Sequence, residues 1–207
     1  MTITNSKVYI QTDMQGRILR CEGGYTTPAD LSGWTYIDEG TGDRYNLCQS
    51  HYFDGGLFTD DGIPLYKLQD GKVLERTPAE LDADRLPGRK VLQIAQSKVD
   101  LAAYLEAHPL QWTDGQRYSI TAEKQSQLIG TVVAAQADGR PPEWNSTGGV
   151  CREWDIAELV ALSVAIKTRV KALVKYQQAQ EIAMSNAATL EELESVVVDY
   201  DSVEVTA

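Results

Sequence analysis

The amino-acid sequence predicts an α+β fold, with a small antiparallel β domain followed by a helix-rich C-terminal unit that contains short hairpins. In residues 1–76, short alternating runs are separated by glycine and aspartate turns, a pattern typical of antiparallel strands. In residues 89–207, apolar side chains recur at intervals of three and four, which is typical of amphipathic helices. Residues 77–88 combine a helix start with a proline–glycine stop, and we expect a capped helix and linker there.

The β-rich domain is expected to contain two hairpins. Residues 14–16 supply the turn of the first hairpin. The second has an Asp70-Gly71 turn between two alternating runs, which is the stronger hairpin signal. The expected strands are residues 8–10, 17–20, 34–37, 65–68 and 72–75.

A helix is predicted to begin at Thr77. This residue is a suitable N-cap, Pro78 occupies the first helical position, and Glu80 completes a capping box. The Pro-Gly pair at 87–88 is expected to end this helix, and a second helix is expected over residues 89–107. The predicted core face of that second helix consists of Leu92, Ala95, Val99, Ala102 and Leu105.

Two later segments share the outline of tryptophan, tight turn, short strand and capped helix. The first leads from Trp112 to a helix capped by Thr121, and the second leads from Trp144 to a helix capped by Asp155. Duplication and chance similarity both remain open, and the two hairpins are candidates for pairing their strands. The predicted core face of the first capped helix is Leu128, Ile129, Val132 and Val133.

The last long helix is expected over residues 156–183 and carries two apolar stripes. One stripe is enough to pack a helix in its own domain. That stripe consists of Ile156, Leu159, Ile166, Val170 and Leu173. A short helix capped by Thr189 and a terminal strand at residues 196–200 are expected to complete the chain.

The second stripe of the long helix predicts a partner-binding surface. Val160, Val164 and Val174 widen the apolar face, and Lys167 and Lys171 add basic charge beside it. In a chain of formal net charge −11, such a basic rim suits an acidic partner surface. The partner would be a fibre protein or a second copy of this chain. The alternative is that the preceding helix covers both stripes within one subunit.

Charge and composition argue against nucleic acid and membrane partners. A net charge of −11 repels a phosphate backbone, and the sequence has no basic cluster to reverse this. No apolar stretch approaches the roughly 18 residues of a membrane span, and residues 1–13 lack a secretory signal pattern. The three cysteines are odd in number and widely spaced, which favours a reducing compartment. The acidity either keeps the protein in solution or imitates nucleic acid.

No motif in the chain predicts catalysis. Cys48 and His51 have the spacing of two metal ligands and Cys21 offers a third, but a structural zinc site needs four. His51 and His108 lie outside any nucleophile motif, and no glycine-rich phosphate loop is followed by lysine and serine or threonine. We therefore expect a protein that is not an enzyme and has no metal and no cofactor.

Two segments resemble proteins of bacteriophage tails. Residues 65–85, LYKLQDGKVLERTPAELDADR, resemble a passage of small tail proteins encoded beside tail fibres. Residues 154–193 are similar to the C-terminal region of uncharacterised phage tail and tail-fibre-assembly families. This chain differs from many assembly chaperones in its doubled tryptophan-turn-helix unit.

The resemblance implies a non-enzymatic tail-module protein that binds a tail fibre or receptor-binding protein as an assembly chaperone. One alternative is a structural subunit of the virion tail tip or baseplate. Another is an acidic accessory protein that binds a host factor. The expected location is the host cytoplasm during phage assembly, or the virion tail.

Overall fold

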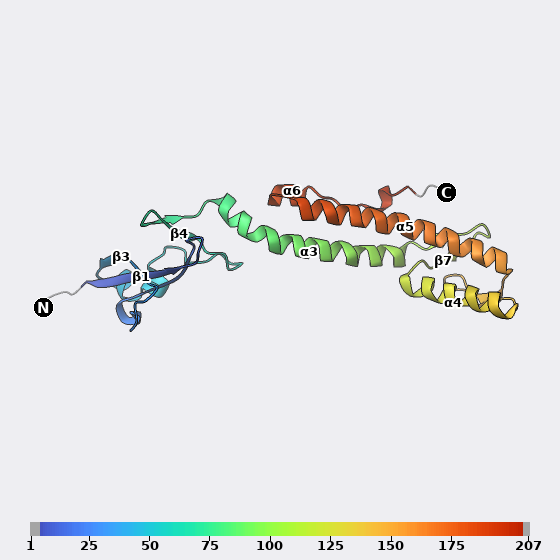
Figure 1. Ribbon diagram of the computed structural model, residues 1–207, viewed down its shortest axis with the longest axis horizontal. Coiled ribbons are helices and arrows are strands. Elements are labelled where there is room, and N and C mark those ends of the chain that lie inside the picture. Colours follow the sequence, from blue (N-terminus) through green and yellow to red (C-terminus); the bar gives the residue numbers. More distant parts are fainter. Residues whose placement is uncertain (1–4, 205–207) are drawn as a thin grey trace. The chain divides into compact units, whose positions relative to one another are not determined.

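The computed structural model describes residues 5–204, and the chain divides into two compact units, residues 1–87 and 88–207 (Figure 1). Within the described residues, the first unit contains five strands, three short helices and the start of a long helix, and the second contains long helices with two small hairpins. The predicted α+β class is confirmed. Among residues 5–204, no helix is both long enough and apolar enough to cross a membrane.

The first unit is built on a three-stranded antiparallel sheet in the order β2-β1-β3. Its strands are β1 (Ser6–Thr12), β2 (Ile18–Gly23) and β3 (Thr35–Gly40). The Asp13 carboxylate accepts the backbone N–H of Gln15 and of Arg17, which stabilises the tight turn between β1 and β2. The first predicted hairpin is therefore confirmed.

The predicted second hairpin is also present, as β4 (Tyr66–Gln69) and β5 (Lys72–Glu75). Asp70 and Gly71 both have positive φ, 51° and 72°, as a two-residue hairpin turn of type I′ requires. Between β2 and this hairpin lie the short helices η1 (Gly24–Thr26), α1 (Asp43–Asn46) and α2 (Cys48–His51). The core of the unit consists of Val8, Ile10, Ile18, Cys21, Cys48, Tyr52 and Phe53.

The helix predicted to stop at residues 86–88 continues without a break as α3 (Pro78–Ala107). Its predicted start is confirmed, because the Thr77 hydroxyl accepts the Glu80 N–H at 3.3 Å and the Glu80 carboxylate accepts the Thr77 N–H at 2.9 Å. Pro87 removes the N–H that would bond to the Ala83 carbonyl, but Ala83 is exposed and water can take its place. The predicted linker is thus helical, and the boundary between the two units lies inside α3.

The second unit contains two hairpins, each followed by a capped helix. The first pairs β6 (Leu110–Gln111) with β7 (Arg117–Tyr118) before α4 (Ala122–Asp138). The second pairs β8 (Glu143–Trp144) with β9 (Arg152–Glu153) before α5 (Ile156–Asn186). The two hairpins form separate sheets, joined by one backbone hydrogen bond from a residue of the second hairpin's turn to the Arg117 carbonyl at 2.8 Å.

The predicted caps of the second unit are confirmed. The Thr121 hydroxyl accepts the Lys124 N–H, and the Asp155 carboxylate accepts the first-turn N–H groups of Ala157 and Glu158. Thr189 caps the short helix α6 (Leu190–Glu194). Because a cap satisfies backbone donors that a helix start leaves free, these residues fix where each helix begins.

The predicted terminal strand at residues 196–200 is wrong. Residues 196–199 have no regular structure and are followed by the 3-10 turn η2 (Tyr200–Ser202). Backbone groups of this segment bond to side chains, not to a neighbouring strand: Gln93 donates to the Val196 carbonyl at 3.2 Å, and the Asp199 N–H donates to the Tyr176 hydroxyl at 3.1 Å. The buried Tyr200 then anchors the end of the chain.

The predicted core face of α3 is largely exposed, and that of α4 is half exposed, since Leu128 is buried and Val132 packs against the core. On α3, Leu92 is 65% exposed and Val99 61%, while Ala95 and Ala102 are also exposed and Leu105 alone of the predicted face is buried. The opposite side of α3 packs inward, because Ser97 is buried and bonded to the side chain of Gln177 on α5. The same side of α3 carries Leu101, Tyr104 and Leu105, which pack in the core of the unit, so α3 has two apolar stripes and the predicted one faces outward. In α4, the outward residues are Ile129 and Val133.

Candidate protein-binding groove

The helices α4 and α5 pack against each other and leave an apolar groove of about 490 Å³. Leu128 on α4 and Ile166 on α5 are both buried, and they connect the groove to the core of the unit. The groove is lined by Gln125, Leu128, Ile129, Val132, Val133, Ser163, Val164, Ile166 and Lys167.

Three large aliphatic side chains of the groove remain more than half exposed. Ile129 is 60% exposed, Val133 58% and Val164 55%. Single exposed aliphatic residues are ordinary on a protein surface, but these three gather at one concave site with few polar groups. Each therefore has apolar surface that a partner's side chains would remove from water.

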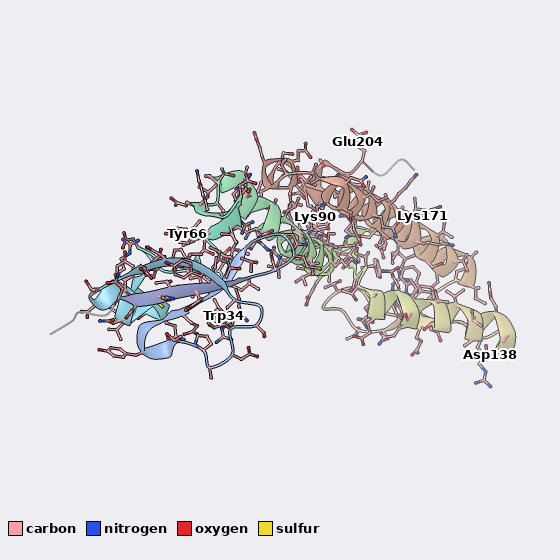
Figure 2. All side chains as sticks on the ribbon, turned by 60° about the vertical axis from the view of Figure 1, so that its left-hand side comes forward. Trp34, Tyr66, Lys90, Asp138, Lys171 and Glu204 are labelled. Atoms are coloured by element: carbon pink, nitrogen blue, oxygen red, sulfur yellow. The ribbon has the colours of Figure 1, made fainter. Side chains whose placement is uncertain are left out.

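The predicted partner-binding residues lie on one side of α5, since their spacing of three and four residues follows the helical repeat. Val164 and Lys167 line the groove. Val160 and Val174 are half-buried outside it, and Lys171 is exposed and projects from α5 (Figure 2). The structure thus brings two of the five residues into the groove itself.

The sequence pattern did not predict the α4 wall of the groove, because Ile129 and Val133 were expected to lie in the core. Leu128 and Ala135 are the residues of α4 that are buried. They are seven residues apart and define one inward stripe, so Ile129 and Val133 belong to a second stripe four residues apart. The same surplus of apolar stripes that identified the surface of α5 was present in α4 and would have identified its wall.

Charge at the groove comes from lysine side chains. Lys167 lines the groove and Lys171 lies one turn further along α5, and both side chains are exposed. Neither lysine is within ion-pair distance of a carboxylate in the part of the chain that the structure describes. Two cations beside an apolar groove favour an apolar partner segment that carries carboxylates on its flank.

The residues considered for metal binding or catalysis have other structural roles. Burial raises the pKa of the Cys21 thiol well above its ordinary value, with the neighbouring Cys48 adding to the effect, and burial also raises the pKa of Cys48. His51 is exposed and bonds to the Ser50 hydroxyl at 2.8 Å. His108 stacks on Tyr104, with ring centroids 4.0 Å apart, just after α3 ends. Within residues 5–204, no three His, Cys, Asp or Glu side chains are grouped to hold a metal ion.

Comparison with known proteins gives one match. A family model described as a domain of unknown function, DUF4376, matches residues 89–202. The matched segment contains α4, α5 and every residue that lines the groove. No curated protein and no solved structure matches the chain.

Proposed function

The chain belongs to the DUF4376 family, a domain of unknown function. We propose that it is a non-enzymatic phage tail-module protein that binds a tail fibre or receptor-binding protein, and the resemblance of residues 65–85 and 154–193 to phage tail proteins supports this proposal. The role proposed first is that of an assembly chaperone. The groove between α4 and α5 is the proposed binding site, and it is the observation that carries the proposal.

The occupant proposed for the groove is an amphipathic segment of the fibre protein with apolar residues on one side and carboxylates beside them. Ile129, Val133 and Val164 offer apolar walls to such a segment. Lys167 and Lys171 supply positive charge in an otherwise acidic chain. A helix laid in a groove is a common mode of peptide recognition, and charge at its rim sets orientation and rate of association.

The resemblance to phage tail proteins supports the choice of partner. Residues 65–85 carry the more distinctive of the two similar passages, and the structure forms them as the β4–β5 hairpin and the first turns of α3. Residues 154–193 carry the other passage and include Val164 and Lys167. The groove therefore lies partly in a segment that is similar to tail-fibre-assembly families.

Two alternatives predict other partners for the same protein. A structural subunit of the tail tip or baseplate would keep the groove filled in the finished virion. An acidic accessory protein, with its net charge of −11, would attract and bind a basic host factor. Mass spectrometry of purified virions separates the first two roles, because a mounted subunit remains in the particle and a chaperone leaves it.

The binding site is tested by co-expressing the chain with a tail-fibre protein from the same genome and measuring co-purification. We expect Val164→Glu to weaken association by at least about tenfold, because the interface would bury an unpaired carboxylate. The matched control is Ile182→Glu, which places the same charge on another exposed position of α5. We expect the control to bind as the unchanged chain does.

Both variants should melt cooperatively near the temperature of the unchanged protein, since each substitution is at an exposed site. Full association of Val164→Glu would contradict the groove as the binding site. Loss of association by both variants would point to a general effect of charge on α5 and would also contradict it.

A further inference from the structure

The outward face of α3 in the second unit is apolar and has no charged side chain over residues 88–103. Its bulkiest members, Val91, Leu92 and Val99, are all more than half exposed. The face consists of Gly88, Val91, Leu92, Ala95, Val99, Ala102 and Ala103, all of them exposed. Among residues 88–103, the charged ones, Arg89, Lys90, Lys98 and Asp100, lie on the flanks or the inner side at 3.6 residues per turn.

The opposite side of α3 already packs in the core of the second unit. Ser97 is buried, its hydroxyl accepts a hydrogen bond from the Gln177 side chain at 3.1 Å, and its carbonyl accepts one from the Tyr200 hydroxyl at 2.7 Å. Lys98 pairs with Glu181 at 3.1 Å on the flank. Leu101, Tyr104 and Leu105 on this inner side pack in the core of the unit, so the outward face is not the core face of α3.

The spacing of the outward face indicates a helix as its partner. Leu92, Ala95, Val99 and Ala102 follow one another at intervals of three, four and three residues. This spacing matches that of a coiled-coil seam, which repeats every 3.5 residues and packs side chains between those of a facing helix.

We propose that the seam binds the α3 seam of a second copy of this chain in antiparallel orientation. Antiparallel packing centred near residue 97 sets Leu92 against Ala102 of the second copy and Val99 against its Ala95. Every layer then combines a large with a small side chain, which fills space evenly. The pairing is symmetric, as a dimer of identical chains requires.

Charge at the ends of the seam favours the same orientation. In the antiparallel pair, Glu106 approaches Gly88 and Arg89 of the second copy, so a carboxylate meets a guanidinium. In a parallel pair, Glu106 of one copy would lie beside Glu106 of the other. Leu92 would then face Leu92 and Ala95 would face Ala95, which leaves a gap between the two alanines. Glu106 follows Ala102 by four residues and so lies at the end of the seam, where opposite charges attract and like charges repel. The seam therefore specifies both the partner and its direction.

The first test is sedimentation equilibrium of the full chain over a range of concentrations. Because the seam is short and rich in alanine, we expect a weak dimer that forms in the micromolar range. Val99→Glu should remain monomeric, since it would bury a carboxylate at the centre of the seam. The matched control is Ile129→Glu, an equally exposed position in the α4–α5 groove, which should dimerise normally.

A chain that is monomeric up to about 100 µM, or a Val99→Glu variant that dimerises as the unchanged chain does, overturns the proposal. Loss of the dimer in Ile129→Glu also overturns it, because the groove would then be the interface.

If Val99→Glu does not fold, reversal of the charge pair tests the proposal instead. Arg89→Glu should weaken the dimer, and adding Glu106→Arg to that variant should restore the dimer. A double variant as weak as Arg89→Glu alone contradicts the antiparallel pairing.

Cross-linking tests the orientation. In a chain where the exposed Cys151 is replaced by serine, Leu92→Cys and Ala102→Cys are made as separate proteins. In the antiparallel pair, residue 92 of each copy is about 15 Å from residue 92 of the other along the axis, which is beyond the reach of a disulfide. We expect a mixture of the two proteins to cross-link on oxidation and Leu92→Cys alone not to. A cross-link by Leu92→Cys alone, or none in the mixture, overturns the antiparallel register.

The dimer seam lies on α3 and the fibre-binding groove lies between α4 and α5, so each proposal can be contradicted without the other. Val99→Glu should lose the dimer and retain fibre binding, whereas Val164→Glu should do the reverse.

Discussion

The two units differ in where their exposed apolar residues and their buried charged residues lie. In the first unit, exposed apolar side chains such as Met14, Tyr25 and Phe58 are scattered over turns and short connections. In the second unit, most of them line up along the faces of α3, α4 and α5, with Val150 and Val197 as exceptions. Scattered residues are normal on any surface, but aligned ones indicate a binding surface. Both binding surfaces that we propose lie in the second unit for this reason.

Buried charge shows the opposite distribution. In the first unit, the Asp84 carboxylate lies between the guanidinium groups of Arg17 at 2.9 Å and Arg76 at 2.8 Å. Only 5% of the Arg76 side chain is exposed, and it also donates to the carbonyls of Pro64 and Glu80, both at 2.8 Å. This network connects the β1–β2 turn, the β4–β5 hairpin and the start of α3. The second unit instead uses neutral bonds among Ser97, Gln177 and Tyr200 at its core.

The largest effect is expected from Leu159→Ala in α5. Leu159 is fully buried in the core of the second unit, so the substitution leaves a cavity. We expect a loss of about 3–4 kcal/mol in the free energy of unfolding of that unit, measured by denaturant titration. Val197→Ala, at an exposed position, is the control and should change it by less than about 0.5 kcal/mol. A loss below about 1 kcal/mol for Leu159→Ala would contradict a well-packed core.

A smaller loss is expected from Asp84→Ala in the first unit. The substitution leaves the buried Arg76 guanidinium without its carboxylate, although two backbone carbonyls still accept from it. We expect a loss of about 2–3 kcal/mol in the free energy of unfolding of the first unit. The control is Asp82→Ala, which removes a more exposed carboxylate paired with Arg85 on the same helix and should cost about 0.5 kcal/mol or less. Equal effects of the two substitutions would show that the network does not stabilise the unit.

The smallest effect is expected in the pH dependence of the first unit. Hydrogen bonds from the Lys67 ammonium, at 2.6 Å, and from the Thr77 N–H lower the pKa of Glu80 to about 2. Because the folded pKa lies below the ordinary value of 4.5, this carboxylate stabilises the unit above pH 4.5, and the stabilisation is lost as the pH falls towards 2.

Thermal melts of the unchanged protein and Glu80→Gln test this effect. The difference in Tm between the two proteins should be present at pH 6 and should close by pH 2. A difference that is constant over this range would show that the Glu80 charge makes no contribution.

Much of the local structure could be predicted because its signals are local. Thr77, Thr121, Asp155 and Thr189 begin helices where their side chains can cap free N–H groups, and this depends on a few neighbouring residues. The β4–β5 hairpin forms at Asp70-Gly71, a turn sequence that requires little from the rest of the chain. The prediction that the helix ends at Pro87 was wrong, because a proline removes only one backbone hydrogen bond and a long helix can tolerate that loss.

The candidate groove was half predicted. The surplus stripe on α5 identified Val164 and Lys167, since a helix needs one apolar stripe for its core and this helix has two. Ile129 and Val133 were assigned to the core, because spacing alone does not say which of two adjacent stripes on α4 faces inward. Only the packing of Leu128 and Ala135 settles that choice.

The sequence by itself determined the α+β class, the starts of the capped helices, the hairpin turns and the excess of apolar stripes over what the core requires. Each of these follows from residues that are neighbours in the chain. The tertiary structure alone decided the rotation of α3, because the helix carries two apolar stripes and local periodicity does not say which of them faces inward. Leu101, Tyr104 and Leu105 pack in the core, Ser97 bonds to Gln177 80 positions away, and Leu92 and Val99 are left outside.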